Sequence, residues 1–202
     1  MNTPLGQRAP SAHAWEPVGS GFGIRAGAQL IDTLVHLAAW MLLSLLLGVV
    51  AGIYSAAAGV PVDAMLEKMS SPTWYGYLAA GLGYALYHTV MEWRCGATVG
   101  KRILGLVVVD MAGAPISWRQ ALGRSLAYYL DGFFFGAVAL ANMKPPLQQR
   151  LGDKWNGTLV VSRSMVPPGS PTGMTRFWDS LSLGLLANAA CFTLAIAVGL
   201  YS

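Results

Sequence analysis

The sequence predicts an all-α membrane protein with three to four transmembrane helices, a re-entrant or short third segment and a small cytoplasmic β-ribbon. Two observations predict the class: 54% of the 202 residues are hydrophobic and only 11% are charged, whereas soluble domains contain about 25% charged residues. A third observation predicts the ribbon, because two short valine-rich runs lie among basic residues in the second half of the chain. We therefore expect the lipid bilayer to be a partner of this chain.

Charge and cysteine content argue against other classes. The net charge is only +4, and the basic residues lie in loops beside apolar segments, where they orient helices in a bilayer rather than bind nucleic acid. The two cysteines, Cys95 and Cys191, are far apart and show neither disulfide nor metal-ligand spacing. We expect no cofactor, no metal and no nucleic-acid partner.

The first predicted helix carries a polar stripe. Residues 1–20 are polar, with Pro and Gly, and are expected to form a disordered cytoplasmic tail. The apolar run over residues 25–58 is longer than the roughly 20 residues that span a bilayer, so this helix is expected to tilt or to project. Because an α-helix turns about 100° per residue, four polar side chains fall on one stripe: Arg25, Gln29, Asp32 and His36.

A second helix is predicted over residues 74–93. Tryptophans near both of its ends are typical of the two membrane–water interfaces. Its polar residues also recur at helical spacing, which predicts a face complementary to the first stripe. These residues are Tyr77, Tyr84, His88 and Glu92.

The stretch of residues 94–124 is rich in Lys and Arg, which predicts the cytoplasmic side of the membrane. Within it, residues 103–110 form a short β-branched run, ILGLVVVD, and residues 156–162 form a second, NGTLVVS. We expect the two runs to pair and to pack on another element, since a lone hairpin in water is marginal. Ser117 is expected to cap a helix that begins at Trp118.

The segment of residues 125–143 has just the length of one span. Basic residues lie on both sides of it, Asp131-Gly132 interrupts it, and Asn142 lies near its end. A single crossing would place one basic cluster outside. We therefore expect a re-entrant helical hairpin with both ends in the cytoplasm, a shape that is tolerated where it is buried in protein or lines a cavity.

A proline-rich linker is predicted over residues 164–175, followed by an additional C-terminal transmembrane helix within residues 176–202. Asn188 is the strongly polar residue in the middle of this last apolar run. With the N-terminus and Arg176 in the cytoplasm, the C-terminus is expected outside. We expect this helix to be an appendage to the preceding unit.

Three motifs in the chain carry a family resemblance. They are IRAGAQLID on the first helix, then GATVGKRILGLVVVD, then QQRLGDKWNGTLVV. Their order and spacing resemble the RDD family of bacterial membrane proteins, which is named for one arginine and two aspartates. The resemblance covers about residues 20–163, and we expect a membrane domain over residues 21–163. It implies a multi-pass protein of the bacterial cytoplasmic (inner) membrane, and the family is generally described as transporting unknown ligands.

The resemblance also assigns the residues that name the family. Arg25 and Asp32 match the first two, and Asp153, in LGDKWNGT, matches the third. Family members more often have His directly before that aspartate, where this chain has Gly152. Asp131 is a rival for the third position, because it lies inside an apolar segment.

Two groups of residues are candidates for function. An ionisable group at bilayer depth costs at least ~2.5 kcal/mol on insertion scales, so it needs a partner or a task. The first group is an ion-binding, ligand-binding or structural polar network of Arg25, Asp32, His36, His88, Glu92, Asp131 and Asp153. The second is a cytoplasmic motif of Gly100, Lys101, Arg102, Gly105, Arg124, Gly157 and Thr158. We expect its lysine and neighbouring arginine at anionic headgroups.

Two interpretations of the first group stay open. In the structural one, Arg25 reaches the headgroups, and Asp32 pairs with a basic residue of the motif. The candidates for that base are Lys101, Arg102 and Arg124. In the functional one, each acid works with the histidine one helical turn away as an ion or proton site. The pairs are then Asp32 with His36 and Glu92 with His88.

We do not expect an enzyme. The motif GATVGK of residues 96–101 has three residues between its glycines and no Ser or Thr after its lysine, whereas a phosphate-binding loop has four and needs that hydroxyl for Mg²⁺. The sequence shows no Ser-His-Asp, Cys-His or metal-ligand cluster.

Two functions remain from the sequence. The first is transport of an ion or small solute by a homo-oligomer, since three or four spans give little wall for a pathway. The alternative is a non-transporting membrane scaffold or assembly partner. A water-accessible cavity lined by the two acid–histidine pairs favours transport, whereas their closure into salt bridges and hydrogen bonds favours the scaffold.

Overall fold

The structure is a computed structural model that describes residues 15–63, 67, 74–166 and 176–201. Most of the predicted tail and linker therefore lies outside the described residues. The elements follow in the order α1 (Phe22–Ala58), α3 (Trp74–Cys95), α4 (Val99–Ile103), β1 (Leu106–Asp110), α5 (Trp118–Asp131), α6 (Phe133–Asn142), α7 (Leu151–Trp155), β2 (Thr158–Ser162), η1 (Arg163–Met165) and α8 (Phe177–Tyr201).

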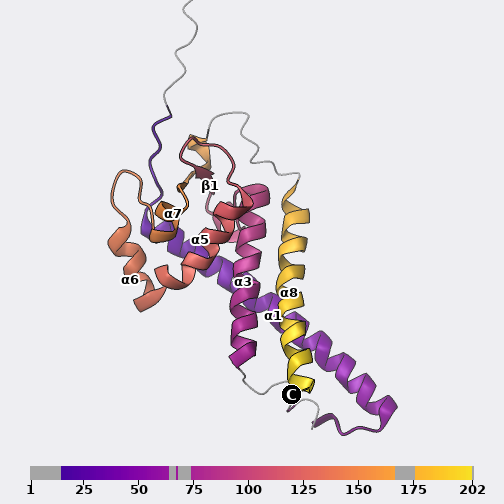
Figure 1. Ribbon diagram of the computed structural model, residues 1–202. Coiled ribbons are helices and arrows are strands. Elements are labelled where there is room, and N and C mark those ends of the chain that lie inside the picture. Colours follow the sequence, from indigo (N-terminus) through magenta and orange to yellow (C-terminus); the bar gives the residue numbers. More distant parts are fainter. Residues whose placement is uncertain (1–14, 64–66, 68–73, 167–175, 202) are drawn as a thin grey trace, which may run out of the picture.

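The longest element, α1, crosses the molecule at an inclination to the other long helices (Figure 1). It begins at Phe22, slightly before the predicted start, and ends at Ala58, where Gly59 forms a left-handed cap with φ 67°. At 1.5 Å per residue its length is about 55 Å, against about 30 Å for the hydrocarbon core of a bilayer. Its length therefore exceeds one perpendicular span, as the sequence predicted.

The helices α3 and α8 lie side by side (Figure 1). Small residues permit the close contact, since Gly184 of α8 lies against Tyr87 and Gly83 of α3 lies against Asn188. At one end of this contact Tyr87 belongs to a buried cluster with Phe177. The last helix is thus an integral part of the helix packing rather than the appendage that the sequence predicted.

Two of the described helices are long and apolar enough to cross a membrane, namely α1 and residues 177–198 of α8. Both expose rows of large apolar side chains, such as Leu34, Met41 and Leu45 on α1 and Leu186 and Leu194 on α8. Surfaces of this kind mark contact with lipid or with another apolar partner. With 22 residues, α3 is long enough to span a bilayer, but it is not among the two helices that are both long and apolar enough to do so. The count of three to four transmembrane helices stays a prediction.

The predicted ribbon is present. The strands β1 and β2 pair antiparallel, with Val108 opposite Val160. One face packs on Ala28 of α1 and Ala121 of α5. The other face is covered by side chains from loops and from the segment before α1: Trp15, Leu147 and Val166. Both faces are buried, which supplies the packing that a lone hairpin lacks.

The first strand is shorter than predicted. Residues 103–110 were expected to be extended, but Ile103 ends the short helix α4 and β1 begins at Leu106. The side chain of Thr98 caps α4 by accepting from the backbone N–H of Lys101. A local cap therefore outweighs the β-branched character of the residues at this boundary.

The helices α5 and α6 form a hairpin. As predicted, Ser117 caps α5, here in a capping box with Gln120. The break also falls where it was predicted, because α5 ends at Asp131 and α6 starts immediately after Gly132.

Both arms of this hairpin return to the same region. Near the start of α5, Gln120 Nε2 donates to the backbone carbonyl of Asn156 at 3.0 Å. At the end of α6, Lys154 Nζ donates to the carbonyl of Asn142 at 2.9 Å. The chain therefore enters and leaves the hairpin beside α7, whereas its depth in a bilayer stays a prediction.

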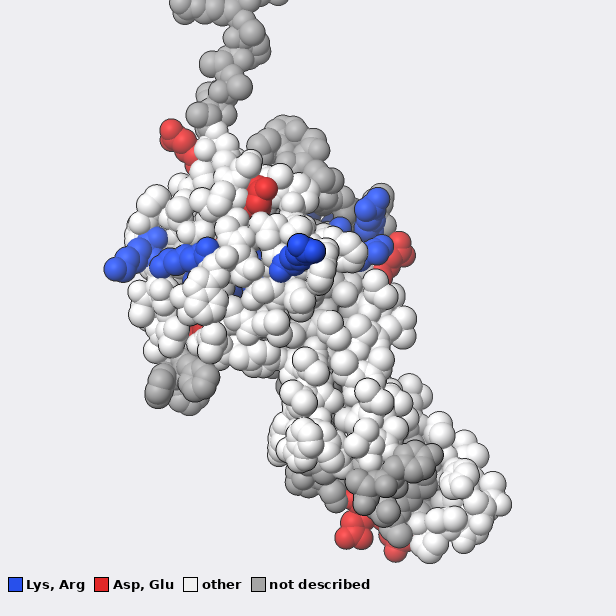
Figure 2. Space-filling view, viewed as in Figure 1, with Lys and Arg blue, Asp and Glu red and all other residues white. Residues whose placement is uncertain are grey.

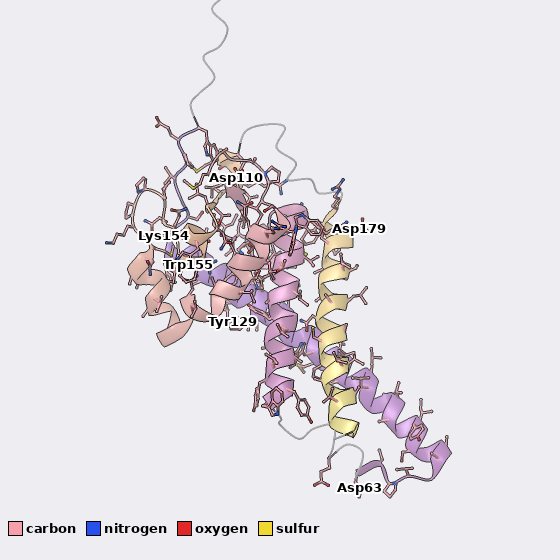
Figure 3. The ribbon with its side chains drawn as sticks, in the orientation of Figure 1. Asp63, Asp110, Tyr129, Lys154, Trp155 and Asp179 are labelled. Carbon is pink, nitrogen blue, oxygen red and sulfur yellow. The ribbon has the colours of Figure 1, made fainter. Side chains whose placement is uncertain are left out.

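Lys and Arg side chains gather at one end of the molecule, whereas acidic side chains are visible at both ends (Figure 2). Figure 2 shows Lys and Arg gathered in one band over the end that holds the ribbon and the hairpin. Lys154 lies within this end in Figure 3. The opposite end of the same view shows acidic residues, among them Asp63 (Figures 2 and 3). The distribution agrees with the basic end being the cytoplasmic side that the sequence predicted.

Candidate functional site

Arg124 is the centre of a network of buried ion pairs. It lies on the inward face of α5 and is fully buried. Its Nε donates to Glu92 of α3 at 2.9 Å. Its Nη1 donates to Asp153 of α7 and, at 2.6 Å, to the hydroxyl of Thr158 in β2. One side chain therefore joins α5 to three other elements.

Lys101 of α4 is the second cation at Glu92. Its Nζ donates to that carboxylate and, at 2.8 Å, to the hydroxyl of Tyr128. Only 3% of Lys101 is exposed. The expectation that Lys101 lies at the lipid headgroups is therefore wrong, because α4 folds inward against α1 and brings the amine to a buried acid.

Arg25 of α1 holds the other end of the network. Its Nη2 donates to Asp153 at 2.5 Å, and its Nη1 donates to the carbonyl of Gln148 at 2.9 Å. Its side chain is only 5% exposed. The structural interpretation had Arg25 reach the headgroups, which is wrong because the loop before α7 supplies partners inside the protein. The pairing agrees with Asp153 as the third residue that names the family.

Asp131 has a capping role. Its carboxylate accepts from the backbone N–H groups of Leu151 at 3.2 Å and Gly152 at 3.4 Å. These are first-turn donors of α7 that lack partners within the helix. The carboxylate also lies 3.9 Å from Nε of Arg150. Asp131 therefore fastens α7 to the end of α5, rather than pairing with Arg25.

Asp32 lies apart from the ion pairs. Its carboxylate accepts from the hydroxyl of Thr98 at 2.5 Å, from the N–H of Gly100 at 2.8 Å and from the hydroxyl of Tyr87 at 3.2 Å. Among the described residues it forms no ion pair. The expected pairing with Lys101, Arg102 or Arg124 is therefore wrong, since neutral donors at the start of α4 satisfy the charge.

The other motif residues shape the chain around this site. A Cβ on Gly100 would lie 2.0 Å from the carbonyl oxygen of Ala28, so only glycine lets α4 approach α1 this closely. Gly105 and Gly157 precede the two strands with φ of 67° and 60°, which favours glycine. Arg102 lies outside the network, with its guanidinium 4.7 Å from the ring of Phe177.

The two predicted acid–histidine pairs are not joined by hydrogen bonds. His36 Nδ1 lies 2.5 Å from the side-chain nitrogen of Asn188 in α8. Trp40 Nε1 donates to the side-chain oxygen of the same asparagine at 2.9 Å. His88 Nδ1 lies 3.9 Å from Glu92 Oε1, and neither ring nitrogen has a hydrogen-bond partner among the described residues. Of the two pairs proposed as an ion or proton site, His88 and Glu92 are therefore within ion-pair distance, whereas His36 contacts Asn188.

The polar faces of α1 and α3 meet over a shorter length than predicted. Gln29 donates to the hydroxyl of Tyr84, and Tyr87 reaches Asp32. Tyr77, the first member of the predicted stripe, is 73% exposed. Because α1 crosses α3 at an inclination (Figure 1), the two stripes share only the crossing zone.

The ion pairs contain one more cation than carboxylates when His88 is neutral. They comprise Arg25, Lys101, Arg124 and Arg150 against Glu92, Asp131 and Asp153. Burial alone would raise the pKa of Asp153, but Arg124 and the other two arginines outweigh it and hold that pKa below its ordinary value. Burial alone would lower the pKa of Lys101, but Glu92 outweighs it and raises that pKa. Both groups are therefore charged at neutral pH.

A cavity of 340 Å³ lies beside the network, between the first turns of α1 and the α5–α6 hairpin. Its charged lining residues are Arg25, Asp131 and Arg150. Tyr128 and Tyr129 also line it, and the latter is labelled in Figure 3. The four acid–histidine residues of the functional interpretation do not line this cavity: Asp32, His36, His88 and Glu92.

Sequence reasoning missed several residues of this site. Tyr128 is one of them, and its spacings of four from the predicted Arg124 and three from the predicted Asp131 along α5 are the signal for a shared helix face. Arg150 precedes Asp153 by one turn, and its backbone N–H donates to that carboxylate at 3.0 Å. The Arg-x-x-Asp spacing in the sequence is therefore the signal that could have indicated the contact between Arg150 and Asp153.

A mostly helical body with two membrane-length apolar helices, held at one end by buried ion pairs, defines a membrane-associated protein. The chain belongs to the RDD family, whose pattern it matches over residues 20–157. This match confirms the resemblance drawn from the motifs. It includes Arg25, Asp32 and Asp153, and it ends before β2 and α8.

One relative is the "Uncharacterized protein YxaI" of Bacillus subtilis (strain 168), which is 31% identical over 130 residues. The alignment covers 60% of this chain and 85% of the relative. No solved structure matches. Gly152, where family members more often carry His, lies so close to α5 that a Cβ would be 2.6 Å from that of Ala127. Here a small residue lets α7 pack directly on α5.

Proposed function

We propose that this RDD protein is a non-transporting membrane scaffold whose buried charges hold its own elements in one arrangement. One observation carries the proposal: both carboxylates expected to form an ion site are closed. Asp32, His88 and Glu92 are fully buried, and both carboxylates are occupied by fixed donors. An ion pathway needs groups that can exchange their ligands with water. The proposal includes no enzymatic step and no cofactor.

The network links parts of the chain that are distant in sequence. Arg25 and Asp153 are 128 residues apart, and Arg124 is 32 residues from Glu92. A buried pair is not in itself a large source of stability, but removing one partner leaves an uncompensated charge. Such a network therefore favours a single arrangement of helices and ribbon over alternatives, which is the property that a scaffold requires.

The arrangement in the membrane is also part of the proposal. We infer a multi-pass protein of the bacterial cytoplasmic membrane with α3 as a further span and with the N-terminus and the basic end in the cytoplasm. The basic band of Figure 2 supports this orientation. Reporter fusions after Met143 and at the C-terminus test it. A cytoplasmic reporter after Met143 and an external one at the C-terminus are expected, whereas an external reporter after Met143 contradicts the re-entrant hairpin.

Transport is the second candidate, and the cavity is the observation that favours it. Two arginines and one aspartate face a space between α1 and the hairpin, and charged residues in such spaces mark solute pathways in membrane proteins. Since a few spans give little wall for a pathway, this candidate requires a homo-oligomer.

Flux measurements in proteoliposomes separate the two candidates. Wild type and Asp32→Asn are reconstituted at equal density and tested with protons, Na⁺ and K⁺, with empty liposomes as the baseline. If the protein is a scaffold, flux with neither protein exceeds that of empty liposomes, and Asp32→Asn unfolds at a lower temperature than wild type. Wild-type flux that disappears in folded Asp32→Asn supports transport and overturns the scaffold.

A further inference from the structure

Two arginines at the cavity between α1 and the α5–α6 hairpin have hydrogen-bond donors that the described residues do not use. Arg25 and Arg150 both line it, and their side chains are only 5% and 11% exposed. The Nε atoms of both arginines lack a hydrogen-bond partner among the described residues. Buried donors are nearly always paired in folded proteins. Arg150 Nε lies 3.7 Å from Asp153 and 3.9 Å from Asp131, beyond hydrogen-bond distance, so both guanidinium groups at the cavity can take a further acceptor as partner.

The local charge indicates the sign of that acceptor. The charged residues that line the cavity are two arginines and one aspartate, so the lining carries one more positive than negative charge. Asp131 also lines the cavity, but its oxygens already accept from the N–H groups of Leu151 and Gly152. A single oxyanion at the two arginines would balance the charge of the lining.

Guanidinium groups suit this ligand chemistry. Arginine presents N–H groups in a planar fork that matches carboxylate and phosphate oxygens. The guanidinium of Arg150 lies 4.2 Å from the ring of Tyr128, and Nη1 and Nη2 of Arg25 are held by Gln148 and Asp153. These contacts fix both arginines before a ligand arrives, which reduces the entropy that binding would cost.

The rest of the lining is largely apolar. Phe22, Ala26, Ala139 and Met143 complete much of the wall. Pockets that combine an apolar wall with a few fixed polar groups suit ligands with both characters. A fully hydrated inorganic ion would leave these side chains without a partner.

We propose that this cavity binds an oxyanion group, a carboxylate or a phosphate, of a molecule with an apolar part, through Arg25 and Arg150. The headgroup of an anionic phospholipid and a free anionic solute share this chemistry. The site does not depend on whether the protein is a scaffold or a transporter, since occupancy is a binding property alone.

Native mass spectrometry of the full chain in neutral detergent tests the site. The probes are phosphatidylglycerol, zwitterionic phosphatidylcholine as the matched lipid, and inorganic phosphate, whose binding is followed by the shift in unfolding temperature. Preferred binding of phosphatidylglycerol identifies a lipid source. A phosphate-dependent shift that phosphatidylglycerol abolishes identifies an anion site that free solutes also enter. Equal occupancy by both lipids with no effect of phosphate overturns the proposal.

Two variants address the cavity by different means. Arg150→Gln removes a charge, and Ala26→Leu fills the space from an exposed position on α1, where leucine keeps the helix. Each is expected to weaken phosphatidylglycerol binding at least tenfold. The matched controls are Arg119→Gln, an exposed arginine, and Ala38→Leu, an exposed alanine of α1, neither of which lines the cavity. Both should bind as wild type does.

Ala26→Leu keeps the test decisive if Arg150→Gln fails to fold. Its folding is checked by gel filtration and by its unfolding temperature. Undiminished phosphatidylglycerol binding by folded Ala26→Leu overturns the assignment to this cavity.

Discussion

Replacing Asp153 by asparagine keeps the shape of the side chain and removes its charge. The carboxylate is fully buried and is the acceptor for Arg25 at 2.5 Å and for Arg124. Arg150 Nε also lies 3.7 Å away. Asparagine retains one acceptor oxygen, but its amide group would present N–H donors to guanidinium donors. Two or three buried arginines then lose their counter-charge at once.

The size of the effect follows from this burial. Removing one partner of a buried ion pair typically costs about 3 to 5 kcal/mol, because the remaining charge stays uncompensated. For a protein of this length, each kcal/mol lowers the unfolding temperature by about 2 to 4 °C. Asp153→Asn should therefore unfold roughly 6 to 20 °C below wild type.

Thermal unfolding in a mild detergent, followed by the loss of the monodisperse gel-filtration peak, measures this difference. The control is Asp63→Asn, the same substitution at an exposed residue, which should unfold close to the wild-type temperature. If Asp153→Asn behaves like that control, the ion pairs do not hold the fold together and the reasoning fails.

Further predictions concern pH, packing and the last helix. The pKa of Asp153 is held below its ordinary value of 3.8, so its contribution to stability is present above that pH and is lost as the pH falls below it. Asp153→Asn should flatten this acid limb of unfolding temperature against pH. The pKa of Lys101 is raised above its ordinary value of 10.5, so its contribution is present below that pH and is lost as the pH rises through the folded-state pKa. Lys101→Met should remove the alkaline limb, and an unchanged limb would show that another group causes it. Gly100→Ala places a Cβ 2.0 Å from the Ala28 carbonyl and should lower stability by about 1 to 3 kcal/mol, whereas Gly48→Ala, with open space around it, should not. Equal unfolding temperatures for these two variants would contradict the close α1–α4 contact. Asn188→Ala removes the links from α8 to His36 and Trp40 and should cost roughly 0.6 to 2 kcal/mol. Thr193→Ala, which loses only a bond within its own helix, is the matched comparison, and a larger loss there would argue against the α1–α8 link.

Local signals in the sequence predicted the elements at the end of the molecule that holds the ribbon and the α5–α6 hairpin. The β-branched runs predicted the ribbon, Ser117 predicted the start of α5, and Asp131-Gly132 predicted its break. Each of these is decided by neighbours within a few residues, through strand propensity or capping. A single sequence is sufficient for features of this kind.

The partners of the buried charges were not predictable in the same way. Asp32 was expected to pair with a base, yet it is satisfied by Thr98 and Gly100. That outcome depends on a five-residue helix, α4, whose start is fixed by a cap and whose approach depends on a missing Cβ. The pattern of charges along α1 contains no information about where α4 starts or how closely it approaches α1.

Helix crossing explains the remaining differences. The stripes on α1 and α3 were identified correctly as polar faces, but periodicity gives a direction around a helix and not the angle between two helices. Tyr77 therefore falls outside the contact, while Asn188 of α8 reaches His36. Arg25 was expected at the surface because Gln148 and the following helix α7, which carries Asp153, could not be placed beside it from sequence alone.

A double-mutant cycle between Arg25 and Asp153 tests most directly whether the buried charges hold the elements of this RDD protein together. The free energies of unfolding of Arg25→Gln, Asp153→Asn and the double variant are compared with wild type in one detergent at neutral pH. The double variant should be less destabilised than the sum of the two single variants by at least about 1 kcal/mol, since residues in one ion-pair network couple. Additivity within about 0.5 kcal/mol, as found for distant and independent sites, would contradict it.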